Sequence, residues 1–364
     1  MSGPESGAPD GPAASGPGAD PRLDPRLLQA LREIGADARA PDPAVDRHSD
    51  PGQVEVVLAA IEDGFDALYA TLPAPDRAAP NVRHVDEVAT SRDGHEVPLR
   101  VFRPAGVLGP LPCVVYLHGG GMAVYSAFGP MYQQWCRDLA ATGLVVVLVG
   151  FRNAWSRAGR APFPAGLDDC RAALEWVGGR REQLGVSSVV LQGESGGANL
   201  CVATALRAKQ EGTLPLIDGV YACVPFVSGG YGWRRAQKLA RLPSLVENDG
   251  YFLSVAALDL LASAYDPHGE HAEDPLCWPW FASEADLAGL PPHVVVLNEL
   301  DPMRDEGVDL FRRLGRAGVS AVGRVQLGLV HGADLIFRTA LSGVYAATAA
   351  DVRRFAVAVS PGRV

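Results

Sequence analysis

Residues 188–208 of this 364-residue chain, SVVLQGESGGANLCVATALRA, decide its fold. The apolar run SVVLQ is typical of a buried strand, and GANLCVATALRA has the pattern of a helix. Between them lies the G-x-S-x-G sequence Gly193-Glu194-Ser195-Gly196-Gly197. Its glycines permit a sharp strand-to-helix turn that projects the serine hydroxyl above a sheet, at the positive end of a helix. A phosphate-binding loop or a plain tight turn would use similar residues, but the flanking strand and helix favour a serine nucleophile.

Five compact apolar runs predict a parallel sheet around this turn. Strands buried on both faces have continuously apolar sequences, because helices cover the two faces of the sheet. Helical patterns alternate with these runs at the spacing of a doubly wound α/β domain. Two earlier runs, joined at the Asp93-Gly94 turn, are typical of an antiparallel ribbon. The five runs are 112–119, 144–151, 188–194, 219–226 and 293–300.

The chain divides into a predicted tail, cap and core. Residues 1–22 are rich in Pro, Gly, Ala and Ser, so we expect a disordered tail. Residues 23–82 have helical periodicity and are expected to form N-terminal cap helices, with an ordinary outer helix layer as the alternative. Residues 83–364 are expected to form the α/β core. Within that core, the segment at about 227–292 is too long for a simple crossover, and we expect it to be a cap insertion above the sheet.

Composition excludes several classes of function. The chain is 48% hydrophobic and 20% charged, which predicts a substantial core. Its 42 acidic and 32 basic residues give a net charge of −10, which argues against a nucleic-acid or anionic-membrane partner. The six cysteines form no C-x-x-C pair, so free thiols are predicted and no metal site is expected. Without a secretory signal or an apolar run approaching 18 residues, we expect a cytoplasmic protein with no membrane insertion.

A histidine and an acid are needed to activate the serine. A hydroxyl is a poor nucleophile until a base takes its proton, and the expected chain order is serine, acid, histidine. Of the eight histidines, His331 lies in a loop between the candidate strand 320–328 and the final helix, where function is expected. Asp301 directly follows the run 293–300 and is predicted to orient His331, as the acid of a triad. Glu299 is the weaker rival.

A glycine loop is predicted to stabilise the oxyanion of the reaction. The sequence His118-Gly119-Gly120-Gly121 ends the run 112–119, and successive glycines let backbone N–H groups approach a ligand closely. The amides of Gly120 and Gly121 are the predicted donors, joined by the amide of Gly196 just after the nucleophile. Gly119 is the nearest alternative. We expect His118 to be structural.

These motifs together resemble those of the hormone-sensitive-lipase family of α/β-hydrolases. Within it, GESGGANL and the run 151–154 (FRNA) resemble the bacterial brefeldin A esterase type. The resemblance covers roughly 83–345. It implies an eight-stranded sheet, a lid built from the N-terminal helices and the inserted segment, and hydrolysis of carboxylic esters without metal or cofactor. The motifs that carry the resemblance are HGGGM, GESGG, DPMRDEG and HGAD.

The resulting hypothesis is a serine carboxylesterase that acts through an acyl-enzyme on small to medium hydrophobic esters or lactones. Two alternatives are a non-catalytic small-molecule-binding protein on the same fold, and an amidase or lactonase that uses the same site. The chain departs from the commoner family pattern at Glu194, Gly196 and 151–156, positions that bear on substrate preference. The partner is a small-molecule ester, and the chain is expected to be a monomer or a homodimer. An apolar pocket is also expected. Its lining should come from a minority of the following residues, since many of them are expected to form the core of the lid: Met122, Tyr125, Phe128, Trp155, Tyr231, Trp233, Tyr251, Phe252, Trp278 and Trp280.

Overall fold

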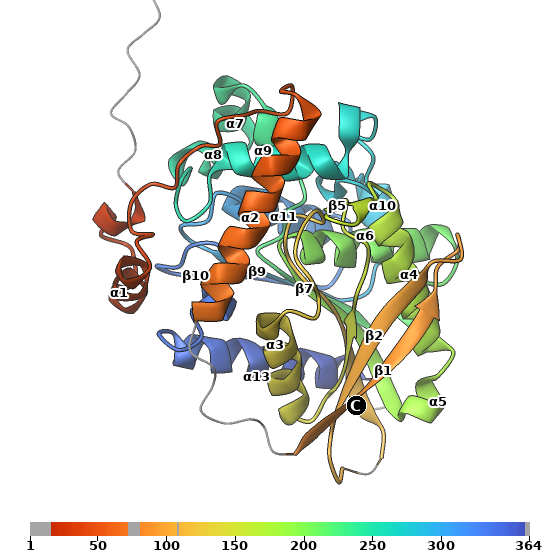
Figure 1. Ribbon diagram of the computed structural model, residues 1–364. Coiled ribbons are helices and arrows are strands. Elements are labelled where there is room, and N and C mark those ends of the chain that lie inside the picture. The colour runs from red at the N-terminus through yellow and green to blue at the C-terminus, as the bar shows by residue number, and fades with distance from the viewer. Residues whose placement is uncertain (1–15, 72–80, 108, 361–364) are drawn as a thin grey trace, which may run out of the picture.

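The computed structural model describes residues 16–71, 81–107 and 109–360, and an eight-stranded sheet forms its centre (Figure 1). The spatial order is β1-β2-β4-β3-β7-β8-β9-β10. Strands β1 and β2 pair antiparallel, β2 pairs antiparallel with β4, and all later pairs are parallel. The mostly parallel eight-stranded sheet is therefore confirmed. The bounds are β1 Val82–Thr90, β2 Glu96–Pro104, β3 Leu111–Leu117, β4 Val145–Val149, β7 Val186–Glu194, β8 Gly219–Cys223, β9 His293–Asn298 and β10 Ala321–Gln326.

Helices cover both faces of the sheet, which explains the continuous apolar runs in its central strands. Every residue of β4, β8 and β9 is buried. Helices α3 and α13 pack together, with α3 against β4 and α13 against β3. Helices α4 and α6 also pack together, with α4 against β1 and β2 and α6 against β7 and β8. The bounds of the core helices are α3 Pro130–Ala141, α4 Ala165–Gly178, α5 Arg181–Leu184, α6 Gly196–Gln210, α11 Arg304–Arg316, α12 Ala333–Ile336 and α13 Ser342–Ala358.

Two separated segments lie together above the carboxyl ends of the strands. The first holds α1 and α2, and the second is the chain between β8 and β9. Helix α2 contacts α9 of the second segment and α3 of the core, and Figure 1 shows it crossing the front of the molecule between them. The helices of the two segments are α1 Pro25–Glu33, α2 Pro51–Thr71, α7 Arg235–Arg241, α8 Ser244–Glu247, α9 Val255–Tyr265 and α10 Glu284–Leu287.

The N-terminal end of the described chain differs from the disordered tail expected for 1–22. Residues 1–15 lie outside the described residues. Residues Pro17–Ala19 form a short 3-10 helix, and Pro17 is buried. Asp20 accepts hydrogen bonds from Arg22 and from the hydroxyl of Tyr251, which lies in the segment between β8 and β9. Composition alone could not predict that residues 17–20 adopt a defined structure, because the residues that hold them lie far along the chain.

A short antiparallel ribbon was not predicted. Strand β5 (Trp155–Ser156) pairs with β6 (Gly159–Arg160) in a sheet of its own. Two-residue strands are too short to show a period of two in the sequence. The ribbon carries two arginines that form ion pairs with α2: Arg157 lies 2.5 Å from Asp63, and Arg160 lies 2.6 Å from Glu55. It therefore joins the core to α2.

No helix in the described part of the chain is long and apolar enough to cross a membrane. The six cysteines are buried free thiols. Their burial raises the pKa of each thiol, most simply seen at Cys113, where it reaches about 12. These thiols are therefore protonated at neutral pH and behave as small apolar side chains.

Candidate active site

The turn between β7 and α6 holds Ser195 in a strained backbone conformation. Ser195 has φ 55° and ψ −121°, in a region that residues with a side chain rarely adopt. The surrounding structure fixes it: the Ser195 amide donates to the Cys223 carbonyl at 2.9 Å, and the Ser195 carbonyl accepts from Phe226. A Cβ atom at Gly197 would lie 2.0 Å from the Leu117 carbonyl oxygen. Glycine is therefore required for α6 to begin this close to β3.

Asp301 and His331 form a buried pair on neighbouring strand ends. The Nδ1 atom of His331 lies 2.8 Å from Oδ2 of Asp301, whose other oxygen, Oδ1, accepts from the Met303 amide at 2.8 Å. Asp301 is 1% exposed and His331 is 7% exposed. The Asn298 side chain holds the histidine loop by donating to the Val330 carbonyl at 2.7 Å. This arrangement places the proton of the neutral imidazole on Nδ1 and leaves Nε2 able to accept one.

Two other acids near the end of β9, the rival Glu299 and also Asp305, face other partners. Glu299 accepts a hydrogen bond from the Gly328 amide at 2.8 Å. Asp305 accepts from the Ser244 amide at 2.7 Å and pairs with Arg304. Among these acids, Asp301 is the one that contacts His331.

The glycine loop after β3 bends through positive φ angles. Gly120 has φ 101° and Gly121 has φ 60°. The amide of Gly119 donates to Oε1 of Glu194 at 2.7 Å, so this alternative donor is already occupied. Gly196 packs against the same loop, since a Cβ atom there would lie 2.4 Å from the Met122 nitrogen. As the first residue of α6, Gly196 has an N–H group without an acceptor in its own helix.

His118 has a structural environment. Its ring stacks on Phe151 with centroids 4.3 Å apart, and its Nδ1 lies 2.7 Å from the Gly119 carbonyl. Burial lowers the pKa of His118 to about 4, so the imidazole is neutral under ordinary conditions. A neutral, stacked ring at this position supports the loop from beneath.

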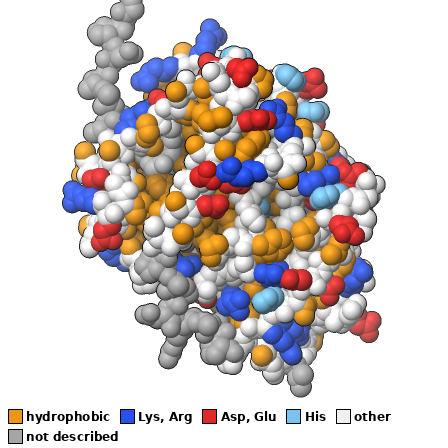
Figure 2. Space-filling view, viewed as in Figure 1, with side chains coloured by type: hydrophobic (Ala, Val, Ile, Leu, Met, Phe, Trp, Pro, Cys, Tyr) orange, Lys and Arg blue, Asp and Glu red, His pale blue; other side chains and the backbone are white. Residues whose placement is uncertain are grey.

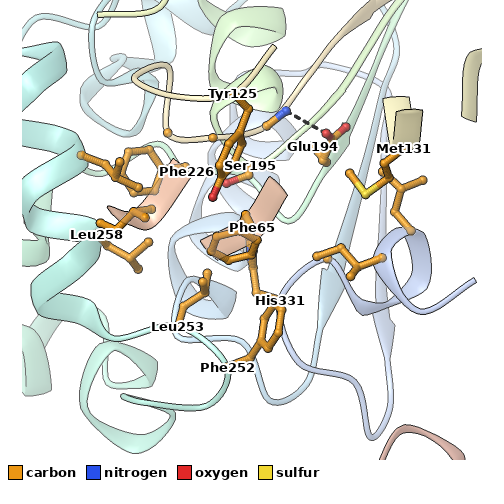
Figure 3. Close-up of a pocket in the computed structure, with 18 of the residues that line it drawn as sticks. Phe65, Tyr125, Met131, Glu194, Ser195, Phe226, Phe252, Leu253, Leu258 and His331 are labelled. Atoms are coloured by element: carbon orange, nitrogen blue, oxygen red, sulfur yellow. Dashed lines mark hydrogen bonds between the residues drawn. The ribbon is translucent and has the colours of Figure 1, made fainter. Parts of the chain in front are cut away.

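A small apolar pocket brings the predicted residues together (Figure 3). It encloses about 90 Å³, and Ser195, His331 and residues 119–121 all line it. Each of these comes from the carboxyl end of a different parallel strand, where α/β sheets place their ligand sites. The walls are largely aromatic and aliphatic: Ile61, Phe65, Tyr69, Tyr125, Met131, Tyr132, Phe226, Phe252, Leu253, Ala257, Leu258, Leu261, Leu335 and Ile336.

Comparison with known proteins identifies the family. A model of the alpha/beta hydrolase fold matches residues 114–335. This chain belongs to the α/β-hydrolase family. The carboxylesterase NlhH of Mycobacterium tuberculosis is 32% identical over 280 residues, which are 74% of this chain and 82% of NlhH. The gibberellin receptor GID1A of Arabidopsis thaliana is 32% identical over 216 residues, 57% of this chain and 58% of the receptor.

A solved structure agrees with this hydrolase over almost its whole length. It is brefeldin A esterase, described as a bacterial homologue of human hormone-sensitive lipase. The two share 51% sequence identity and superpose with a TM-score of 0.93, covering 96% of this chain and 97% of that one. The predicted resemblance to this type is confirmed.

Few of the aromatic residues near the motif loops and in the inserted segment line the pocket. Of the ten residues expected near the pocket, only Tyr125 and Phe252 line it. Tyr231 instead stacks on Phe226 with centroids 4.3 Å apart, and Trp278 packs edge-on against the same ring. These side chains belong to the core of the inserted segment. They support the wall of the pocket without reaching its surface.

The residues that sequence reasoning missed come chiefly from two helices, α2 and α9. Ile61, Phe65 and Tyr69 project from α2 into the pocket, and Leu258 and Leu261 project from α9. Spacings of four and three residues put each set on one helix face. That periodicity is visible in the sequence, but it also fits a helix that packs against the core. Only the position of the helix above Ser195 shows that its apolar face lines the pocket instead of packing against the core.

Among the described residues, no group of three or more His, Cys, Asp or Glu side chains is arranged to hold a metal ion. Two glutamates close to the site, Glu194 and Glu306, are buried, and burial raises the pKa of each to about 8. Glu306 accepts bonds from the Val227 amide and the Tyr231 hydroxyl, at the start of the inserted segment. Glu194 lies in the pocket itself.

Proposed function

We propose that this hydrolase is a serine carboxylesterase with Ser195 as nucleophile, His331 as general base and Asp301 as the acid that orients it. The proposal rests chiefly on the 2.8 Å contact between His331 and Asp301 in a pocket shared with Ser195. The similarity to proteins named carboxylesterase and esterase gives independent support. The largely apolar walls of the pocket suit small to medium hydrophobic esters, lactones included.

The reaction follows from these roles. The Ser195 Oγ atom attacks the ester carbonyl while Nε2 of His331 takes the hydroxyl proton, and Asp301 stabilises the imidazolium. The amides of Gly120, Gly121 and Gly196 donate to the oxyanion of the tetrahedral intermediate. The intermediate collapses, the carbon–oxygen bond to the alcohol breaks, and the alcohol leaves with the proton from His331. Water then attacks the acyl-enzyme with His331 again as base, and the carboxylic acid and free Ser195 are released.

The direct test is Ser195→Ala assayed with a short aryl ester. We expect turnover to fall by about 10⁶-fold, toward the uncatalysed rate, because no other side chain replaces the nucleophile. A serine-directed phosphonate should label the wild-type protein at Ser195 and leave the variant unlabelled. Wild-type turnover in the Ser195→Ala protein would contradict the assignment.

Two alternatives are separated by the same assay. A binding protein would show no turnover over a panel of esters and would bind one small molecule tightly. The gibberellin receptor, as its name states, is such a receptor. Matched ester and anilide substrates distinguish an esterase from an amidase, because amide cleavage requires protonation of a poorer leaving group.

We further propose that the two cap segments form one roof over the site, and that the enzyme is a cytoplasmic monomer or homodimer. The cap proposal is supported by ion pairs that join the segments: Arg39 to Asp249 at 2.6 Å and Arg47 to Asp259 at 2.5 Å. Six buried thiols suit a reducing compartment. Light scattering coupled to size exclusion measures the oligomeric state, and fractionation of cells tests the location.

A further inference from the structure

Glu194 links the nucleophile turn to the glycine loop. It is the residue before Ser195, at the end of β7, and is 8% exposed. Its Oε1 atom accepts from the Gly119 amide at 2.7 Å, and its Oε2 atom accepts from the Tyr116 hydroxyl at 2.7 Å. Figure 3 shows the bond to Gly119 beside Ser195. One carboxyl group thus spans the gap between the end of β7 and the end of β3.

The bond to Gly119 fixes the loop that carries the proposed oxyanion donors. A Cβ atom at Gly119 would lie 3.2 Å from Glu194 Oε1, so the loop already rests against the carboxyl group. On the other side, the Gly121 and Met122 backbone packs against Gly196. Residues 119–121 are therefore held between residue 194 and residue 196, the two neighbours of the nucleophile. The position of the Gly120 and Gly121 amides relative to Ser195 depends on both contacts.

We propose that Glu194 is a positioning residue that holds the oxyanion-binding loop in register with Ser195, and that it does so in its uncharged form. The proposal rests on the proposed function, since it assigns Gly120 and Gly121 to an oxyanion. Glu194 itself acts through the loop and takes no part in bond making or breaking.

The uncharged form keeps the anchoring hydrogen bond. In a protonated carboxyl group the carbonyl oxygen still accepts from the Gly119 amide, so the link between β7 and the glycine loop does not require a charge. A carboxylate would place a full negative charge next to the oxyanion that forms during the reaction. Because the pocket is largely apolar, such a repulsion is weakly screened and opposes the transition state.

The surroundings of Glu194 favour that form. Burial is the main cause that raises the pKa of Glu194 to about 8, and the charge of Asp334 raises this pKa further. The hydrogen bonds from Tyr116 and Gly119 oppose the rise. Besides Asp334, the titratable groups described as interacting with Glu194 are tyrosines and thiols: Tyr69, Tyr116, Tyr132, Cys136, Cys201 and Cys223. The carboxyl group is therefore protonated below about pH 8 and ionises as the pH rises through that value.

The test compares Glu194→Gln and Glu194→Ala with wild type in ester turnover from about pH 6 to pH 10. The glutamine keeps an acceptor for Gly119 and cannot ionise. We expect it to retain kcat within about tenfold of wild type and to lose the decline of kcat that wild type shows above about pH 8. The alanine variant loses the anchor, and we expect kcat to fall by about 10²-fold with little change in KM, as for a lost oxyanion donor. The exposed Glu87 provides the control, since Glu87→Ala should leave kcat unchanged.

A second measurement needs no turnover. Amide hydrogen exchange of the peptide that contains residues 118–122 should be faster in Glu194→Ala than in wild type, because Gly119 has lost its acceptor. Should the alanine variant fail to fold, Tyr116→Phe, which removes only the bond to Oε2, replaces it and should show a smaller acceleration.

The outcomes are distinct. Equal exchange and equal kcat in the alanine and wild-type proteins would overturn the anchoring role, and a decline above pH 8 that persists in Glu194→Gln would overturn the uncharged form. Failure of the proposed function looks different. In that case the folded wild-type protein would neither hydrolyse esters nor be labelled at Ser195, while the exchange experiment would still decide whether Glu194 holds the loop.

Discussion

The residues beneath the pocket and the residues above it are held in place by different kinds of interaction. Beneath it, buried hydrogen bonds fix the loops, as between His331 and Asp301 or between Gly119 and Glu194. Above it, partly exposed arginines pair with carboxylates, and Figure 2 shows basic and acidic side chains mixed on this face of the molecule. These pairs are Arg39–Asp249, Arg47–Asp259, Arg157–Asp63 and Arg160–Glu55.

This difference indicates separate roles for the two regions in the reaction. A buried hydrogen bond is directional, and losing one partner leaves a desolvated polar group behind, so the geometry around Ser195 is tightly specified. An exposed ion pair contributes little and is screened by salt. Since α2 supplies Ile61, Phe65 and Tyr69 to the wall, we expect the roof to govern substrate binding and the buried loops to govern the chemical step.

The largest effect in this comparison should come from Asp301→Asn. The asparagine amide can donate toward Nδ1 of His331 and so favours the wrong tautomer, and we expect kcat to fall by about 10⁴-fold with little change in KM. Steady-state kinetics on a short aryl ester measures this. Glu299→Gln is the control, because Glu299 faces the Gly328 amide. A larger loss in the control than in Asp301→Asn would transfer the role of the acid to Glu299.

Gly196→Ala should have the next largest effect. The added Cβ would lie 2.4 Å from the Met122 nitrogen and 2.9 Å from Gly121, so the glycine loop has to move. We expect kcat to fall by about 10²-fold, the cost of a displaced oxyanion donor. Gly343→Ala at the start of α13 is the matched control, since its Cβ would meet no atom within 4 Å. Equal activity of the two variants would show that the loop tolerates the shift.

A substitution in the roof should separate binding from chemistry. Phe65 packs against Tyr125 and Phe252 with ring centroids 5.4 and 5.9 Å apart, and it lines the pocket. We expect Phe65→Ala to raise KM about tenfold for a hydrophobic ester, because apolar contact with the substrate is lost, and to change kcat by no more than about threefold. A fall in kcat with KM unchanged would show instead that α2 acts on the chemical step.

The smallest effect should come from the ion pairs of the roof. Arg157 is 57% exposed and reaches Asp63 and Glu62 on α2. We expect Arg157→Ala to raise KM by no more than about twofold, since exposed pairs are weak. About 0.5 M NaCl should have a similar effect on wild type and a smaller one on the variant, because salt screens the same contacts. Salt dependence of kcat in place of KM would contradict the division between roof and site.

The sequence predicted the parts of this molecule whose signals are local. The strand, turn and helix around Ser195 form one continuous stretch, and the glycine run at 119–121 directly follows an apolar strand. Asp301 and His331 were found in the same way, from their places just after strands, because parallel strands bring their carboxyl ends to one edge. The eight-stranded sheet came from the resemblance to a known family.

Other features depend on contacts between residues far apart in the chain. The tail prediction missed the contact of Asp20 with Tyr251, since composition reports no partner 231 residues away. The sequence also could not tell which aromatic residues of the inserted segment reach the pocket. Trp278 packs against Phe226 inside that segment, whereas Phe252 lines the pocket.

The sequence by itself therefore determined the fold, the candidate nucleophile and its candidate partners, because each has a pattern written within a few neighbouring residues. Tertiary structure decided which glycine amide is already engaged, which helix faces form the pocket, and how charge is distributed around Ser195. Gly119 and Glu194 lie 75 residues apart and meet only because β3 and β7 are adjacent in the sheet. Burial at that meeting point gives the carboxyl group a pKa that no reading of the G-x-S-x-G motif predicts, since the shift comes from the removal of water by the surrounding fold.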